Sequence, residues 1–248
     1  LLVCDGEQQS HFVPQRRLVL LSKGETGPYR WARPEIIKNR NLLLRNFEFV
    51  RGADGVLFGR PCVEITVKPK NYSYPVRTLW LETERLVELK RRVDLGHGAV
   101  IETSIEDLRF PAGAPQQLFQ FIPPPGTALV WRPAPLNVDS LERLEKLAQF
   151  KLLKPSPTPK GFQFESGSIL NLPGTRVAWL RYTDGLGVIS LFERPKGGSA
   201  GAFAPLPDGT GLPLAGATMY KSVIGQTEVL IAGDFSPELL KQVLASLK

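Results

Sequence analysis

Residues 59–68 read GRPCVEITVK, and apolar and polar side chains alternate along this stretch. The alternation predicts a β-strand in which Val63, Ile65 and Val67 share one face. Further strand patterns follow at short intervals, at residues 77–81, 86–90, 99–102 and 108–110. Short strands joined by short turns are typical of an antiparallel meander rather than of alternating strands and helices. This part of the chain is therefore predicted to be an antiparallel sheet.

Shorter strand patterns precede this meander. Residues 1–4 lead into the turn pair Asp5-Gly6 and residues 9–13 return, which is a strong hairpin signal. A third strand is predicted at residues 17–21. Residues 24–40 show no clear pattern and are predicted to be irregular or weakly helical.

The next segment of the chain changes in composition, because seven prolines fall within residues 111–135. Proline fixes the backbone angle φ and stiffens a linker, so we place a domain boundary here. The predicted division is a first domain over residues 1–122, a proline-rich linker over residues 123–138 and a second domain over residues 139–248.

The second domain is predicted to be a small antiparallel sheet with a helix at each end. The first helix would begin at Asp139, the candidate N-cap, and the last at Ser236, which precedes a proline at the first helical position. A long loop is predicted at residues 195–216. Strand patterns lie at residues 162–164, 177–182, 188–192, 218–223 and 228–232. Strands and helices segregated in this way define the α+β class.

The sequence carries no convincing catalytic or metal-binding motif. Its two histidines, His11 and His97, have no motif partner, and neither a zinc-site spacing nor a phosphate-binding loop occurs. Residues 197–201, GGSAG, match the G-x-S-x-G nucleophile motif, but prolines and glycines follow where that motif needs a helix. The sequence therefore predicts a protein that is not an enzyme and that has no catalytic residues, no metal and no cofactor.

The net charge of +7 is spread over both halves of the chain. A nucleic-acid-binding protein usually concentrates its basic residues on one element, so no nucleic acid partner is predicted. The charge excess instead favours acidic partners or anionic head groups. No apolar run approaches the roughly 20 residues that span a bilayer, so a contact with a membrane is predicted to be peripheral.

One predicted strand carries Leu79 and Leu81 on one face and Trp80 on the other. A strand that is apolar on both faces is either buried on both, or one of its faces lines a cavity. In a sheet curled into a half-barrel, the two leucines would lie on the concave face, where they are candidate wall residues for an apolar ligand. Phe119 and Phe121 are further candidates for this wall. The alternative is an ordinary core under a covering helix.

Several stretches together resemble a known family. They are GRPCVEI at residues 59–65, KPK at 68–70, RTLWLE at 77–82, PKGF at 159–162 and YTDGLGVISLFE at 182–193. The combination is similar to the periplasmic sigma-E factor regulatory proteins of the RseB/MucB type, within the LolA-like lipoprotein carrier superfamily. The stretch at residues 182–193, a hairpin, is the most specific part of the match.

This resemblance implies both a fold and a function. The implied fold is a LolA-like antiparallel half-barrel, here lacking its first strands, followed by a small α+β domain. The implied function is to bind the extracytoplasmic segment of a transmembrane anti-sigma factor and so control release of an envelope-stress sigma factor, with sensing of lipid or lipoprotein as a further role. The chain is then expected in the periplasm with its signal peptide removed, since its only methionine is Met219 and Leu1 is not a translation start.

Two other functions stay open. The first is a lipoprotein or lipid carrier of the LolA type; residues 139–248 argue against it, because a carrier needs no second domain. The second is the extracytoplasmic sensor part of an anti-sigma factor itself, which would require a membrane span and a cytoplasmic domain before Leu1.

The resemblance also implies a disulfide between Cys4 and Cys62, the two cysteines of the chain. Extracytoplasmic proteins tend to join their cysteines in this way, whereas the alternative is two buried free thiols. The pairing would close a loop of about 59 residues and stabilise the chain by roughly 4 kcal/mol on the chain-entropy model.

The hairpin at residues 182–193 supplies the candidate partner-binding residues. These are Tyr182, Asp184, Gly185, Leu186 and Phe192, and the loop at residues 195–216 is expected to act with them. Asp184-Gly185 predicts a two-residue type I′ turn, in which glycine allows the positive φ that the turn needs. The alternative is that the rings of Tyr182 and Phe192 both belong to the core.

Overall fold

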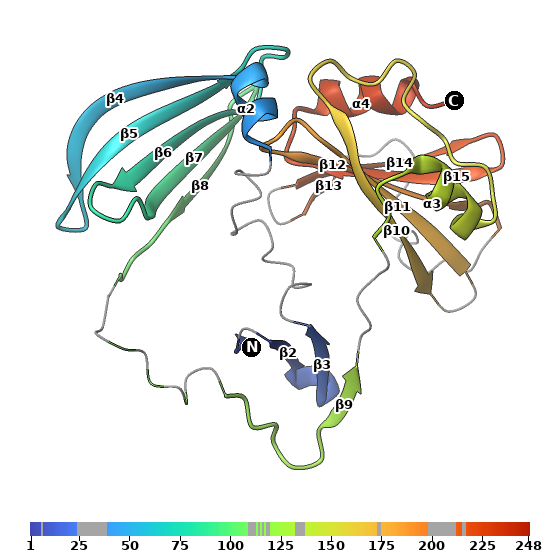
Figure 1. Cartoon of the computed structure of the whole chain (residues 1–248), viewed down its shortest axis with the longest axis horizontal. Coiled ribbons are helices and arrows are strands. Elements are labelled where there is room, and N and C mark those ends of the chain that lie inside the picture. Colours follow the sequence, from blue (N-terminus) through green and yellow to red (C-terminus); the bar gives the residue numbers. More distant parts are fainter. Residues whose placement is uncertain are drawn as a thin grey trace. The chain divides into compact units, whose positions relative to one another are not determined.

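The computed structural model forms two compact units, one of residues 1–38 with 108–135 and the other of residues 39–107 with 136–248. This division differs from the predicted one, in which residues 123–138 were a linker. The structure describes residues 1–5, 7–23, 39–108, 113, 115, 117, 120–131, 137–172, 175–197, 212–214 and 217–248 (Figure 1).

The first unit is built on a four-stranded sheet of order β1-β2-β3-β9. β1 (Leu2–Cys4), β2 (Gln8–Val13) and β3 (Leu18–Lys23) are antiparallel, which confirms the predicted hairpin and third strand. A 3-10 turn, η1 (Pro14–Arg16), joins the last two. The fourth strand, β9 (Ala128–Trp131), pairs parallel to β3. The predicted linker therefore contributes a strand to this sheet.

The second unit begins with a helix, α2 (Arg40–Asn46), and continues into a five-stranded antiparallel sheet of order β4-β5-β6-β7-β8. This confirms the predicted strands at residues 59–68, 77–81, 86–90 and 99–102, whereas Leu108 of the predicted strand 108–110 is not in a strand and residues 109–110 lie outside the described residues. Val67 pairs with Arg77 and Ile65 with Leu79, so the period-two pattern does place these side chains on one face. The strands are β4 (Phe47–Leu57), β5 (Arg60–Pro69), β6 (Val76–Glu82), β7 (Glu88–Gly96) and β8 (Ala99–Ser104).

The same unit contains a six-stranded antiparallel sheet of order β10-β11-β12-β15-β14-β13. Together with its helices, this sheet confirms the α+β class, and all three described sheets are open. Its elements are α3 (Leu141–Ala148), β10 (Gln163–Leu172), β11 (Thr175–Thr183), β12 (Val188–Pro195), β13 (Leu212–Leu214), β14 (Ala217–Ile224), β15 (Thr227–Gly233) and α4 (Pro237–Ala245).

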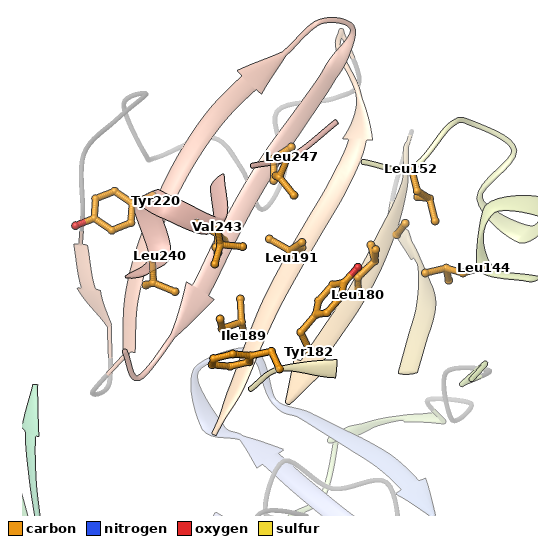
Figure 2. Packing of buried hydrophobic residues seen from close by; sticks show 14 of the residues in the cluster. Leu144, Leu152, Leu180, Tyr182, Ile189, Leu191, Tyr220, Leu240, Val243 and Leu247 are labelled. Carbon is orange, nitrogen blue, oxygen red and sulfur yellow. The ribbon is translucent and has the colours of Figure 1, made fainter. Parts of the chain in front are cut away.

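The largest core lies between this sheet and the helices α3 and α4 (Figure 2). Leu144 of α3 and Leu240 of α4 are fully buried against Leu180, Ile189 and Leu191 of the strands. The close approach of α3 depends on Gly167, because a Cβ atom there would lie 2.3 Å from Leu144 Cδ2.

The caps of the two helices are set by serine side chains. Ser236 Oγ accepts from the Leu239 amide, as predicted for α4. The N-cap of α3 is Ser140 and not Asp139, because the Ser140 hydroxyl accepts the hydrogen bond from the Arg143 amide. In the part of the chain that the structure describes, no helix is both long and apolar enough to cross a membrane.

Candidate functional site

The five-stranded and six-stranded sheets of the second unit meet where the loop between β11 and β12 packs against α2. Leu186, in this loop, contacts the apolar cluster of Leu43, Phe47 and Val67. Gly185 is required at the contact, because its φ is +102° and a Cβ atom would lie 3.1 Å from the backbone nitrogen of Leu43. The loop tip thus belongs to the core of the neighbouring sheet.

A tyrosine makes the reciprocal contact. Tyr72 lies between β5 and β6 and packs against the main core of the six-stranded sheet. Its ring centroid is 5.8 Å from that of Phe162 and 6.1 Å from that of Phe235. Each sheet therefore inserts one apolar side chain into the core of the other, Leu186 in one direction and Tyr72 in the opposite one.

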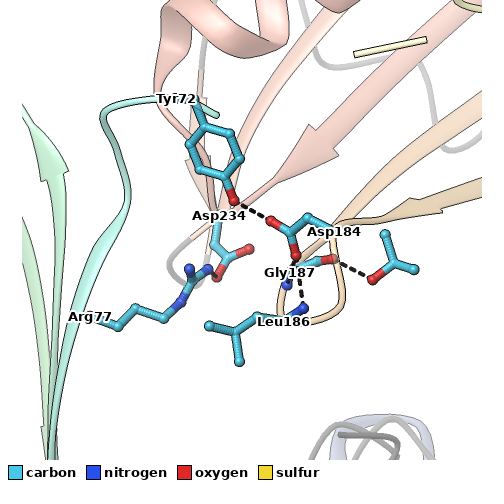
Figure 3. A network of polar contacts seen from close by, with 7 residues as sticks. Tyr72, Arg77, Asp184, Leu186, Gly187 and Asp234 are labelled. Atoms are coloured by element: carbon cyan, nitrogen blue, oxygen red, sulfur yellow. Dashed lines mark hydrogen bonds and ion pairs between the residues drawn. The ribbon is translucent and has the colours of Figure 1, made fainter. Parts of the chain in front are cut away.

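The carboxylate of Asp184 connects these two insertions (Figure 3). Its Oδ1 accepts hydrogen bonds from the amides of Leu186, at 2.8 Å, and Gly187, at 2.7 Å, and these bonds shape the loop. Its Oδ2 accepts a hydrogen bond from the hydroxyl of Tyr72. One fully buried side chain thus holds the loop in shape and joins it to the other sheet.

Burial controls the protonation of this pair. It raises the pKa of Asp184, while the hydrogen bonds from Tyr72 and from the loop amides act in the opposite direction. Burial also raises the pKa of Tyr72, and the neighbouring charge of Asp184 raises it further. The Tyr72 hydroxyl therefore keeps its proton and remains a donor.

Asn46, the last residue of α2, adds a third connection. Its Nδ2 donates to the carbonyl oxygens of Gly161, at 2.6 Å, and Asp184, at 2.8 Å, both on the other sheet. Its Oδ1 accepts from Asn71 Nδ2 at 3.1 Å. Asn46 is 2 % exposed, and its bond to the Asp184 carbonyl oxygen is buried, whereas the other two are partly buried.

Two ion pairs complete the contact. Arg77 of β6 donates to Asp234 at 2.8 Å, and only 6 % of the arginine side chain is exposed. His97 Nε2 and Glu238 Oε1 lie 3.5 Å apart with both side chains exposed, so this second pair contributes little. We call Asn46, Tyr72, Arg77, Asp184, Leu186 and Asp234 the inter-sheet joint.

The structure places most of the predicted partner-binding residues inside this joint or inside the core. Asp184 and Gly185 are buried at the joint, and Leu186 is partly buried there. Tyr182 is 3 % exposed in the main core, as the alternative reading of its ring expected. The predicted two-residue turn is wrong, because Thr183 pairs with Val188 and leaves four residues, 184–187, in the loop.

Phe192, the fifth predicted partner-binding residue, lies on the opposite face of the six-stranded sheet. Its ring is half-buried and stacks on Trp179 with the centroids 5.5 Å apart. It also packs beside Leu230 and Met219, outside the main core. Most of the predicted docking loop, residues 198–211 and 215–216, lies outside the described residues.

The described residues of the predicted ligand wall belong to different units. Leu79 and Leu81 lie on β6 and are half-buried, and Leu79 packs against the cluster that receives Leu186. Phe121 belongs to the first unit, where its ring centroid is 5.5 Å from that of Phe12. Phe119 lies outside the described residues.

The structure does not test the predicted disulfide between Cys4 and Cys62, which lie in different units. Cys62 lies on β5 as a free cysteine and is 2 % exposed. The backbone of Cys4 lies in β1, but its side chain is outside the described part of the chain. The pairing of these two cysteines stays a prediction.

A second buried carboxyl lies away from the joint. Glu193 of β12 is fully buried, and its Oε2 accepts a hydrogen bond from the Leu153 amide at 2.8 Å. Burial raises its pKa to about 8, and the charge of Glu145 adds to the effect. Oε1 has no hydrogen-bond partner among the described residues. No group of three or more His, Cys, Asp or Glu side chains within the described ranges could hold a metal ion.

Four joint residues were not predicted as site residues: Asn46, Tyr72, Arg77 and Asp234. Asn46 and Asp234 lie at the ends of elements, Tyr72 lies between two strands, and Arg77 lies among apolar strand residues. The sequence carries one signal for Arg77. This arginine shares one face of β6 with Leu79 and Leu81, so a charged side chain stands where apolar ones are expected. A buried cation needs a partner, but the sequence alone does not show that Asp234 supplies it.

These features define an α+β protein of mostly antiparallel sheets, two of which are joined by a buried polar network. Solved structures of MucB are among those that share this fold. The chain is similar to MucB in complex with MucA(peri), with a TM-score of 0.63 and 16 % identity over 97 % of this chain and 78 % of that one. The Pseudomonas aeruginosa MucA/MucB complex gives 0.60 and 19 % over 85 % of this chain and 67 % of that one.

A crystal structure of MucB alone gives a TM-score of 0.55 and 16 % identity over 97 % of this chain and 77 % of that one. No protein-family model matches the chain, and no curated protein matches it. At sequence identities of 16–19 %, the likeness shows a shared fold. As a likeness of fold, it confirms the resemblance to the RseB/MucB type.

Proposed function

We propose that this chain is a regulatory binding protein of the RseB/MucB type. It binds the extracytoplasmic segment of a transmembrane anti-sigma factor and thereby controls release of an envelope-stress sigma factor. The observation that carries the proposal is the likeness to MucB in complex with MucA(peri), which extends over 97 % of this chain. The likeness includes both parts of the chain that the sequence resemblance covered, residues 59–110 and 155–248.

The finer parts of the proposal follow the same resemblance. The protein works in the periplasm after removal of its signal peptide, and residues 1–122 and 139–248 act as its LolA-like and α+β domains. The half-buried leucines 79 and 81 support an apolar ligand, lipid or lipoprotein, on the five-stranded sheet. A LolA-type carrier is the second candidate function, and the six-stranded sheet within residues 139–248 counts against it, because a carrier needs no second domain.

A calorimetric titration tests the proposal. The protein is titrated with the periplasmic segment of MucA. In a separate titration it receives the extracytoplasmic segment of an anti-sigma factor encoded beside the gene for this chain. A scrambled segment of the same composition is the control. We expect saturable binding to at least one native segment and none to the scrambled one.

A second arm separates the two candidate functions. The chain is titrated with a fluorescent fatty acid in the absence of any segment. Binding of the fatty acid without binding of either native segment would favour the carrier. Failure of both native segments to bind would overturn the regulatory function.

A further inference from the structure

The inter-sheet joint is small and polar, and this determines how firmly it can hold two sheets. Large hydrophobic interfaces fix neighbouring domains, whereas small polar ones permit relative motion. Among the described residues, each sheet inserts one side chain into the apolar cluster of the other, Leu186 or Tyr72, and Leu42 also lies close to Gly185. The remaining contacts are hydrogen bonds and ion pairs that include the buried side chains of Asp184, Arg77 and Asn46.

The hydrogen bonds of Asp184 make these contacts interdependent. The carboxylate must accept from the loop amides for Leu186 to point into the cluster of Leu43, Phe47 and Val67. The same carboxylate must meet the Tyr72 hydroxyl for the two sheets to stay together. Loss of either partner leaves a buried acceptor unsatisfied, which is costly, so the loop shape and the contact between the sheets are lost or kept together.

We infer that Asp184, Tyr72 and Leu186 are positioning residues, which set the placement of the six-stranded sheet relative to the five-stranded sheet and so assemble one partner site from both. Only the assembly of a partner site from both sheets rests on the proposed function; the placement of the sheets does not. Asp184 is fully buried and its carboxylate is occupied by Tyr72 and the loop amides, so it acts on the partner through the placement of the sheets. A partner that needs both sheets binds only the fraction of molecules in which the joint is closed, so its apparent affinity falls with that fraction.

The first experiment measures the placement of the sheets without any partner. Spin labels are attached at Glu84→Cys and Asp139→Cys, whose native side chains are 70 % and 88 % exposed, one beside each sheet. Cys4 and Cys62 are replaced by serine and alanine in this background. Electron–electron double resonance then gives the distribution of distances between the labels.

The test variant is the double substitution Tyr72→Phe and Leu186→Ala. The matched control is Tyr182→Phe, because Tyr182 is also a buried tyrosine of the second unit but its hydroxyl has no hydrogen-bond partner among the described residues. We expect a narrow distribution for the parent and for the control, and a broad one for the double variant. Equally narrow distributions in all three, with circular dichroism showing that each is folded, would overturn the inference.

The second experiment measures binding to the segment that the parent protein recognises. We expect the double variant to bind at least about tenfold more weakly, the effect of removing a hydrogen bond to a buried charged group, and the control to bind as the parent does. A cross-link then restores the placement: His97→Cys and Glu238→Cys, at positions whose native side chains approach to 3.5 Å, are joined by a short bis-maleimide.

Cross-linking separates a positioning role from direct contact. If the residues position the sheets, the cross-linked double variant regains the parent affinity to within about threefold. If it stays as weak as before cross-linking, Tyr72 or Leu186 contacts the partner directly and the inference is overturned. A parent protein that binds no segment refutes the proposed function instead, and the distance distributions still decide whether the joint places the sheets.

Discussion

Replacing Glu193 by glutamine should change how the stability of the protein depends on pH. Glu193 is fully buried on β12, and burial raises its pKa to about 8 from an ordinary value of 4.5. The folded protein therefore keeps this proton at pH values at which the unfolded chain releases it. The contribution of Glu193 to stability is then fully present below pH 4.5 and is lost as the pH rises toward 8.

The size of the effect follows from the same shift. Each unit of pH between the two pKa values lowers the free energy of unfolding by about 1.4 kcal/mol through this one group. Between pH 5 and pH 7 the loss amounts to about 3 kcal/mol. Glu193→Gln keeps an oxygen that accepts from the Leu153 amide but carries no titratable proton, so its stability should lack this slope.

Urea unfolding at pH 5, 6, 7 and 8 measures the difference directly. We expect Glu193→Gln to gain stability over wild type as the pH rises, while Glu142→Gln, at an exposed position, shows no such gain. A constant difference between Glu193→Gln and wild type from pH 5 to pH 8 would show that Glu193 is ionised in the folded protein. That result would refute the role assigned to its burial.

Three other predictions follow from particular positions. Gly185→Ala should lower the free energy of unfolding in urea by about 2 kcal/mol or more, because both the positive φ and the nearby Leu43 oppose a Cβ atom. The control Gly225→Ala has a positive φ but open space around it and should cost about 1 kcal/mol, so equal losses would contradict the close contact at the joint. The disulfide implied by the family resemblance predicts no reactive thiol in the unreduced, denatured protein, and two thiols per chain would exclude the pairing. Deletion of residues 197–211 with a short glycine bridge should leave the thermal midpoint unchanged and abolish segment binding, and unchanged binding would exclude this loop from the interface.

Much of the fold could be predicted because most of its strands have a recognisable pattern in their own local sequence. The alternation in β5 and β6 and the serine–proline start of α4 each reflect a single element, and the structure has them where the sequence analysis expected. β4 was missed because Gly52, Asp54 and Gly55 interrupt its pattern, and its pairing with β5 shifts register between Arg51 and Asp54. β9 was missed because it lies within a proline-rich segment and pairs with a strand about 110 residues away.

The joint could not be predicted for a different reason. The hairpin at residues 182–193 was predicted to bind a partner, and in the structure its Asp184 and Leu186 contact the other sheet. A carboxylate in a turn is usually exposed, and only the tertiary structure shows that Tyr72 and Asn46 meet Asp184 there. The loop also has four residues where a two-residue turn was predicted, because Asp184 bonds to the amides of Leu186 and Gly187.

The most direct test of the proposed function is whether the chain shields an anti-sigma segment from proteolysis. The native segment and its scrambled control are each digested by thermolysin with and without an equimolar amount of the protein, and the intact segment is followed by mass spectrometry. The proposed function predicts that the protein slows digestion of the native segment at least about tenfold, since only the unbound fraction is cleaved, and leaves the scrambled segment unaffected. Equal digestion rates of the native segment with and without the protein would contradict it.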